Sequence, residues 1–242
     1  MIFLKYLPSR RLTAIAALFA GLLCALNLPA QDVDTDNTQD INSLEEGEFR
    51  GMTRNYEPHH QNAEGNPFFY RAWLPGEVRL ENGSRFRGVE LLYDVFEHLI
   101  ILRKEGSESM HIIDKDMVQS FHLGDNSRAN MANFVRKEFL ENELTEVEDN
   151  QFVQVLYEGD GYLYAINHKE LDDDVFSDLQ SDYFYVAPNG EVHVLEPRKK
   201  AILKTFSDRR EELNDYIEGR DLDVSQRDDL VEVVMYYTTA VN

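Results

Sequence analysis

The residues WLPGEVRLENGSRFRGVELLYD, numbered 73–94, decide the fold because they predict a β-hairpin. Polar and apolar residues alternate over 77–80, as is typical of a strand with one buried face. Asn82 and Gly83 follow, and both tolerate the positive φ angles that a two-residue hairpin turn requires. The alternation then slips by one residue at Gly88, which predicts a β-bulge in the return strand.

Similar short segments, separated by turn signals, continue to about residue 195. Further strands are expected at 98–102, 110–113, 118–123, 134–139, 152–157, 162–167, 183–187 and 191–195. About ten short antiparallel strands predict a mainly β (α+β) protein with either a barrel-like sheet or two packed sheets, and we favour the barrel-like form. The segments are shorter than the roughly 9–11 residues of membrane-spanning strands and carry charged outward positions, which argues against an outer-membrane barrel.

Helical periodicity replaces the β pattern in the C-terminal tail. A first short helix is expected at 198–206. Asp208 and Glu211 have the spacing of a capping box at the start of a second helix, which Gly219 is expected to end. A third helix is expected from residue 225. Short amphipathic helices are not stable alone, so we expect these to pack on the β domain.

The N-terminus has the three zones of a cleavable secretory signal peptide. Basic residues precede an apolar run of about 15 residues, 12–26, and Pro29 and Ala30 lead to the expected cleavage point. An uncleaved anchor is the alternative, but a bilayer needs about 20 apolar residues. Lipidation at Cys24 is a second alternative, and it matches poorly because leucines rather than a small residue precede this cysteine. The protein is therefore expected in the periplasm or outside the cell.

Cleavage after residue 30 changes the charge and the chemistry of the chain. The whole chain has 24 basic and 45 acidic residues. The signal peptide removes three basic residues and the single cysteine, which leaves 21 basic residues, a net charge of −24 and no thiol. This composition excludes cysteine nucleophiles and Cys-ligated zinc, and it argues against binding nucleic acid or anionic lipid.

The segment that follows the signal peptide is polar and acidic, and it is predicted to be a flexible lead because it has few apolar residues to bury. The chain is thus expected to divide into a signal peptide at 1–30, a flexible lead at 31–66, an antiparallel β domain at 67–196 and C-terminal helices at 197–242.

The pattern W-L-P-G-x-V-x-L-x-N-G at 73–83, followed by Val89, Leu91 and Tyr93-Asp94, resembles a pattern in uncharacterised exported β-rich proteins of Gram-negative bacteria. The tail from residue 208 to 237 is similar to the ending of the same group. The resemblance covers most of residues 70–240 and implies the β-rich fold. It implies no activity and no site residue.

No catalytic motif appears in the sequence, and we expect no catalytic residue, cofactor or metal ligand. The chain lacks the Gly-x-Ser-x-Gly and His-Glu-x-x-His motifs and a phosphate-binding glycine loop. Its seven histidines are scattered, and the adjacent His59 and His60 are interpreted as solvated. Acidic clusters at 141–149 and 170–174 are interpreted as solvated loops, with cation binding and carboxylate catalysis as the alternatives.

A basic cluster reverses the acidic trend of the chain and is the candidate contact with a partner. Its members are Arg198, Lys199, Lys200, Lys204, Arg209 and Arg210. The alternative, which we favour, is that these side chains pair with acidic residues of the protein itself.

The sequence predicts a non-enzymatic exported protein that acts by binding or scaffolding, with another envelope protein as its expected partner. No membrane span is expected after signal cleavage. A carrier of a small apolar ligand inside a barrel-like sheet is the alternative function. A hydrolase with a carboxylate or histidine site is the third.

Overall fold

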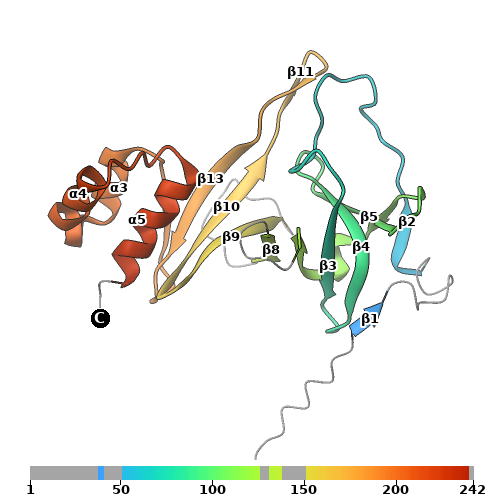
Figure 1. Ribbon diagram of the computed structural model, residues 1–242, viewed down its shortest axis with the longest axis horizontal. Helices are drawn as coiled ribbons and strands as arrows, with labels where there is room; N and C mark the ends of the chain where they lie inside the picture. The colour runs from blue at the N-terminus through green and yellow to red at the C-terminus, as the bar shows by residue number, and fades with distance from the viewer. Residues whose placement is uncertain (1–37, 41–50, 126–130, 138–150, 240–242) are drawn as a thin grey trace, which may run out of the picture. The chain divides into compact units, whose positions relative to one another are not determined.

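The computed structural model describes residues 38–40, 51–125, 131–137 and 151–239 (Figure 1). The chain divides into two units, Met1–Asp36 and Asn37–Asn242, and the described residues all belong to the second. The predicted signal peptide and the acidic cluster at 141–149 lie outside the described residues.

The main sheet contains twelve strands. They are β1 (Thr38–Asp40), β2 (Thr53–Asn55), β3 (Leu74–Leu80), β4 (Arg85–Asp94), β5 (Leu99–Lys104), β6 (His111–Ile113), β7 (Val118–Leu123), β8 (Ala132–Arg136), β9 (Phe152–Gly159), β10 (Gly161–His168), β13 (Gln180–Val186) and β14 (Val192–Leu195). The order is β14-β13-β10-β9-β8-β7-β3-β4-β5-β6-β2, with β1 added alongside β4. All of these pairs are antiparallel except β1–β4.

The predicted hairpin at 73–94 is confirmed as β3 and β4. The predicted two-residue turn is wrong, because the loop has three residues, 81–83: the N–H of Leu80 donates to the carbonyl of Ser84 at 2.8 Å, and only Gly83, with a φ of 84°, adopts a positive φ between them. The predicted bulge is also confirmed, because Gly88 has a φ of 71° and the β3–β4 register shifts opposite it. Each of the ten predicted segments overlaps a strand of the main sheet, and the end of the segment at 134–139 lies outside the described residues.

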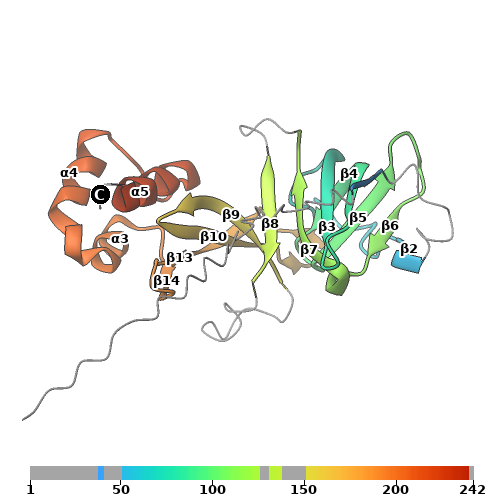
Figure 2. The ribbon, with the colours of Figure 1, turned by 90° about the horizontal axis from the view of Figure 1, so that it is seen from below.

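The sheet is open, so the expected closed, barrel-like form is wrong. The strand order begins at β14 and ends at β2, and no described pairing joins these two edges. Figure 2 shows β8 between β7 and β9, where the path passes from the first group of strands to the second. The physical reason is that the two groups bury their apolar side chains in separate cores, and helices rather than further strands complete the second core.

The first core lies against strands β3–β9 and is rich in aromatic rings. Phe134 lies at its centre, with ring-centroid distances of 5.1 Å to Phe69, 5.0 Å to Tyr93 and 4.7 Å to Phe121. Phe134 and Phe121 come from the neighbouring strands β8 and β7, Tyr93 comes from β4, and Phe69 precedes β3. The packing therefore ties the segment before β3 to the sheet.

The second core lies between the sheet and the C-terminal helices, which are α3 (Lys199–Thr205), α4 (Arg210–Gly219) and α5 (Arg227–Thr239). Figure 1 shows these helices gathered beside β10 and β13. Phe206 contacts Tyr185 at 5.3 Å between ring centroids, and the hydroxyls of Tyr157 and Thr238 lie 2.8 Å apart. The helices thus pack on the sheet, as their short amphipathic sequences require.

The predicted capping box at Asp208 is wrong. Asp208 lies in a 3-10 turn, η3 (Ser207–Arg209), and α4 begins after it without a side-chain cap. Its carboxylate instead accepts a hydrogen bond from the hydroxyl of Tyr237 at 3.2 Å, which links the turn to α5. The predicted end of the helix at Gly219 is confirmed.

Part of the expected lead at 31–66 is ordered against the sheet, contrary to a wholly flexible segment. β1 pairs with β4, and β2 pairs with β6. Glu64 donates its N–H to the carbonyl of Asp174 at 2.8 Å and accepts from the N–H of Phe176 at 2.9 Å. This carbonyl and this N–H belong to a hairpin of two short strands, β11 (Leu171–Asp172) and β12 (Val175–Phe176). The acidic cluster at 170–174 supplies its first strand and its turn. Backbone hydrogen bonds therefore order this polar segment, together with the packing of Tyr56 and Met52 against the sheet.

Substitution of Gly76 on β3 is expected to lower the stability of the protein sharply. An added Cβ would lie 2.4 Å from the carbonyl oxygen of His122 and 2.5 Å from a methyl carbon of Leu91. Gly76→Ala is therefore expected to lower the free energy of unfolding by about 1–3 kcal/mol in urea denaturation, because β3 is held between β4 and β7. Gly219→Ala is the control, since nothing lies within 4 Å of its added Cβ. An unchanged midpoint for Gly76→Ala would contradict the close approach.

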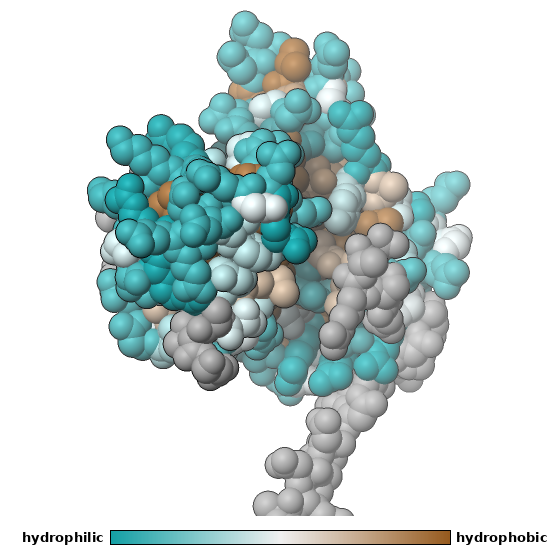
Figure 3. All heavy atoms as spheres, turned by 60° about the vertical axis from the view of Figure 1, so that its left-hand side comes forward, coloured by the Kyte–Doolittle hydropathy of each residue, from teal (hydrophilic) through white to brown (hydrophobic). Residues whose placement is uncertain are grey.

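The surface over the C-terminal helices is largely hydrophilic, with small apolar spots (Figure 3). This fits the acidic composition of the chain. Across the residues that the structure describes, no helix has the length and apolarity needed to cross a membrane.

Candidate functional site

The basic cluster at 198–210 divides into two groups. Half of its members pair with carboxylates of the protein itself. These pairs are Arg198–Glu196, Lys199–Glu218 and Arg209–Glu212. The other half is exposed and forms no ion pair with another described residue. These residues are Lys200, Lys204 and Arg210.

Where the structure describes them, the other titratable groups singled out in the sequence form no metal centre. Within the described part of the chain, no three His, Asp or Glu side chains are grouped so as to hold a metal ion. Four of the scattered histidines lie on strands, as expected; they are His111, His122, His168 and His193. Burial lowers the pKa of His122, which keeps this ring neutral near pH 7.

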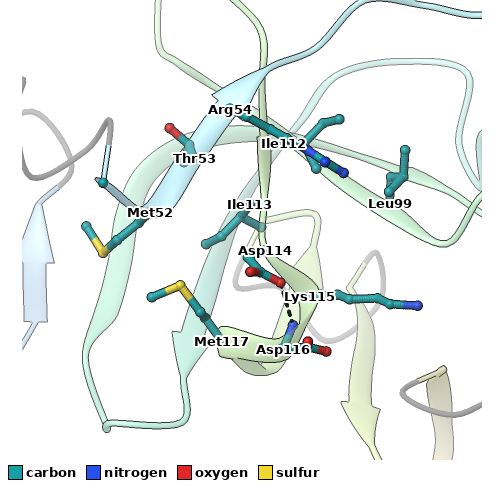
Figure 4. A pocket seen from close by; sticks show the side chains of 11 residues that line it. Met52, Thr53, Arg54, Leu99, Ile112, Ile113, Asp114, Lys115, Asp116 and Met117 are labelled. Atoms are coloured by element: carbon teal, nitrogen blue, oxygen red, sulfur yellow. Dashed lines mark hydrogen bonds between the residues drawn. The ribbon is translucent and has the colours of Figure 1, made fainter.

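One cavity of about 350 Å³ lies between β2 and the segment that joins β6 to the 3-10 turn η2 (Lys115–Met117) (Figure 4). Figure 4 shows Met52 and Met117 beside each other at one end, where both pack against the first core. Asp114 is committed to η2, since its Oδ1 accepts a hydrogen bond from the N–H of Asp116 at 3.1 Å. These contacts serve the fold, and the candidate site lies elsewhere.

A second cavity, of about 310 Å³, combines aromatic rings with titratable side chains. We call it the Asp94 cavity. Its lining includes Tyr56, His59, His60, Phe68, Trp73, Leu92, Asp94, Glu97 and Met110. Ligand sites in proteins are mostly apolar concavities of about 300–1,000 Å³ with a few polar groups, and this cavity fits that description.

Backbone hydrogen bonds hold the cavity walls along the C-terminal end of β4. The N–H of Phe69 donates to the carbonyl of Tyr93 at 2.8 Å, and the N–H of Val95 donates to the carbonyl of Pro67 at 3.0 Å. The N–H of Tyr56 donates to the carbonyl of Met110 at 3.0 Å. The segment before β3 is therefore held along β4 and β6, and it places Tyr56 and the histidines beside Asp94.

Asp94 ends β4 and is 2% exposed. Its Oδ1 accepts hydrogen bonds from the N–H groups of Phe96 and Glu97, both at 2.9 Å, which form the turn after the strand. Its Oδ2 accepts no hydrogen bond from another described residue, although Asp94 lines the cavity. Burial raises the pKa of Asp94 to about 6, against the opposing effect of the two N–H groups.

Glu97 faces two histidines at the mouth of the cavity. Its Oε1 lies 3.2 Å from Nδ1 of His59 and 3.4 Å from Nε2 of His60. The His60 ring also contacts Phe96 and Phe176 edge to face, with centroids 5.4 and 5.7 Å away. His59 is exposed, as interpreted from the sequence, whereas His60 is half-buried, and both lie against this carboxylate.

Two aromatic side chains, Tyr56 and Trp73, complete the description of the cavity lining. Burial, and then the charges of Asp94 and Glu97, raise the pKa of Tyr56 to about 12, so its hydroxyl stays protonated. Trp73 lies beneath the guanidinium of Arg103, whose Cζ is 4.4 Å from the ring centroid. The lining therefore contains the carboxyls of Asp94 and Glu97 together with aromatic side chains.

Sequence reasoning missed this site because its parts lie far apart in the chain. His59 and Glu97 are 38 residues apart, and the first belongs to a segment with a polar, acidic composition. The one available signal was Asp94 at the end of an apolar strand, where a buried acid is unusual. Comparison of the chain with protein-family models, with curated proteins and with solved structures finds no significant match.

Proposed function

We propose that the protein is an exported, non-enzymatic binding protein that takes up a small organic cation in the Asp94 cavity. Export rests on the apolar run at 12–26 and places the protein in the periplasm or outside the cell. The single observation that carries the binding role is the carboxyl of Asp94, which lines an aromatic cavity and has an oxygen without a partner among the described residues.

Charge favours a cation over a neutral or anionic ligand. Two carboxyls line the cavity, and its described lining has no Lys or Arg. A cation that displaces water from this site would gain an ionic contact with Asp94 and contacts with aromatic faces, which attract cations. The alternative prediction, a carrier of a small apolar ligand, was made for a barrel-like sheet, whereas the sheet is open.

Trp73 makes the proposal testable, since it is the only tryptophan of the chain and lines the cavity. The probe is benzyltrimethylammonium, whose charge does not change with pH. We expect it to change the fluorescence of Trp73, and to bind about tenfold more tightly at pH 7 than at pH 5 because Asp94 becomes ionised between them. Asp94→Asn should remove this pH dependence and weaken binding at pH 7 about tenfold.

Asp160→Asn is the matched control, because Asp160 is exposed in the β9–β10 turn and does not line the cavity. It should bind the probe as the unchanged protein does. Equal affinity for benzyl alcohol, or no binding of benzyltrimethylammonium at millimolar concentration, would contradict the proposal.

Hydrolysis is the second candidate, and the Glu97–His59 and Glu97–His60 contacts favour it. A histidine oriented by a carboxylate can act as a general base. The described lining contains no Ser, Thr or Cys, so water would have to be the nucleophile. Hydrolysis of p-nitrophenyl acetate that falls with His60→Ala, but not with His193→Ala, would support this candidate; equal rates for the two variants would exclude it.

A further inference from the structure

The strand β14 forms one edge of the main sheet and lies far from the Asp94 cavity in the strand order. It pairs with β13 alone, in the register Val186↔Val192, Tyr185↔His193, Phe184↔Val194 and Tyr183↔Leu195. Edge strands carry unpaired N–H and C=O groups, which proteins usually cover, charge or keep short. β14 therefore has one row of backbone N–H and C=O groups that β13 does not pair.

The hairpin turn identifies the outward-facing groups. The N–H of Ala187 donates to the carbonyl of Glu191, so this pair is hydrogen-bonded. Bonded and non-bonded pairs alternate along an antiparallel ladder, and the next pair, Val186↔Val192, is therefore non-bonded. It follows that the N–H and C=O groups of Val192 and Val194 point away from β13.

A groove of about 550 Å³ runs beside this open edge, between β14 and α3. Val192 and Val194 line it from the strand, and Ala201, Lys204 and Thr205 line it from the helix. Val194 is 56% exposed, which is high for a β-branched side chain on a strand. The groove thus offers backbone hydrogen-bonding groups, an apolar side chain and a helical wall together.

The helical side of the groove carries the positive charge of Lys204, which lines it, and Lys200 lies nearby on the same helix, outside the lining. Lys200 and Lys204 are one turn apart on α3, both are exposed, and neither pairs with a carboxylate of the described chain. Glu196, which also lines the groove, is paired with Arg198. In a chain with 45 acidic and 24 basic residues, two uncompensated lysines beside an open strand edge select for a negative occupant.

We propose that an extended, acidic segment of a partner protein binds in this groove by adding a strand to β14. Its backbone pairs with Val192 and Val194, and its carboxylates face Lys200 and Lys204. A second copy of this chain is the less favoured occupant, because two strongly acidic chains would repel each other and bring their lysines together. The surface is independent of the Asp94 cavity and goes beyond the function proposed for it.

The test is a selection of random ten-residue peptides displayed on phage against the purified protein. We expect the enriched peptides to carry β-branched residues alternating with Asp or Glu. The decisive variant is Val194→Pro, which removes an N–H that the fold does not use and which edge strands tolerate. Synthetic copies of the enriched peptides should bind Val194→Pro and Lys204→Glu about tenfold more weakly than the unchanged protein.

Two controls separate loss of the groove from loss of the fold. Lys115→Glu makes the same charge change on η2 and should leave peptide affinity unchanged. The far-ultraviolet circular dichroism of Val194→Pro should match that of the unchanged protein; if it does not, Lys204→Glu alone decides. Failure to enrich acidic peptides, or equal peptide binding by Lys204→Glu, would overturn the proposal. Self-association that Val194→Pro abolishes would assign the groove to a second copy instead.

Discussion

Phe134→Ala is expected to lower the free energy of unfolding by about 3–5 kcal/mol. Phe134 is 1% exposed and its ring packs against Phe69, Tyr93 and Phe121. Its strand, β8, is hydrogen-bonded to β7 and β9 on its two sides. The surrounding rings therefore cannot move in to fill the space without breaking ladder hydrogen bonds, so most of the cavity should persist. Urea denaturation monitored by circular dichroism measures the loss.

Two comparison variants show whether the loss comes from the aromatic packing. Phe134→Leu keeps most of the buried volume and should cost less than about 1.5 kcal/mol. Leu179→Ala removes a side chain that is 39% exposed and should change stability by about 0.5 kcal/mol at most. A loss below about 1 kcal/mol for Phe134→Ala would mean that the first core is not organised around this ring.

Asp94 should make the protein less stable as the pH rises from 4 to 7. The pKa of this carboxyl is about 6 in the folded protein, against an ordinary value of 3.8. The folded state therefore holds the proton over a range in which the unfolded chain has released it. The protonated carboxyl makes its full contribution to the free energy of unfolding below pH 3.8. This contribution is lost as the pH rises through 6, and the complete loss amounts to about 3 kcal/mol.

Asp94→Asn isolates this effect, because asparagine cannot ionise and its amide oxygen can accept the same two N–H groups. The difference in unfolding free energy between Asp94→Asn and the unchanged protein should therefore shift by about 2 kcal/mol in favour of the variant between pH 4 and pH 7. Urea denaturation at a series of pH values measures it. Asp160→Asn should show no such shift, and parallel curves for Asp94→Asn would contradict burial of a titrating carboxyl.

The strands were predictable from the sequence, but the closure of the sheet was not. Alternation along 77–80 and the turn signal at Asn82 and Gly83 depend only on neighbouring residues; the two strands are confirmed, although the turn between them has three residues and not two. Whether two sheet edges meet depends on contacts between distant residues, which alternation does not encode. The β11–β12 hairpin escaped prediction for a local reason, since Asp173 and Asp174 adopt φ angles of 46° and 62° in place of the usual Asn-Gly turn.

The candidate site was less predictable than the fold. The polar composition of 51–66 indicates disorder when only apolar burial is counted, whereas the segment is held by backbone hydrogen bonds to β6 and its preceding residue and to the β11–β12 hairpin. His60 therefore reaches Glu97 through tertiary pairing alone. The basic cluster was recognisable as a charge reversal, but only the pairing of Arg198, Lys199 and Arg209 shows which lysines are left exposed.

The docking of the segment before β3 also limits the order in which the chain can fold. Lys169 donates to the carbonyl of Asn66 at 2.8 Å across 103 residues, and Phe176 contacts the ring of His60. A chain that emerges from the ribosome N-terminus first must therefore release most of its length before this side of the Asp94 cavity acquires its support. Such distant pairing slows folding. The export that we propose would therefore bring to the secretion machinery a chain in which these contacts have not yet formed.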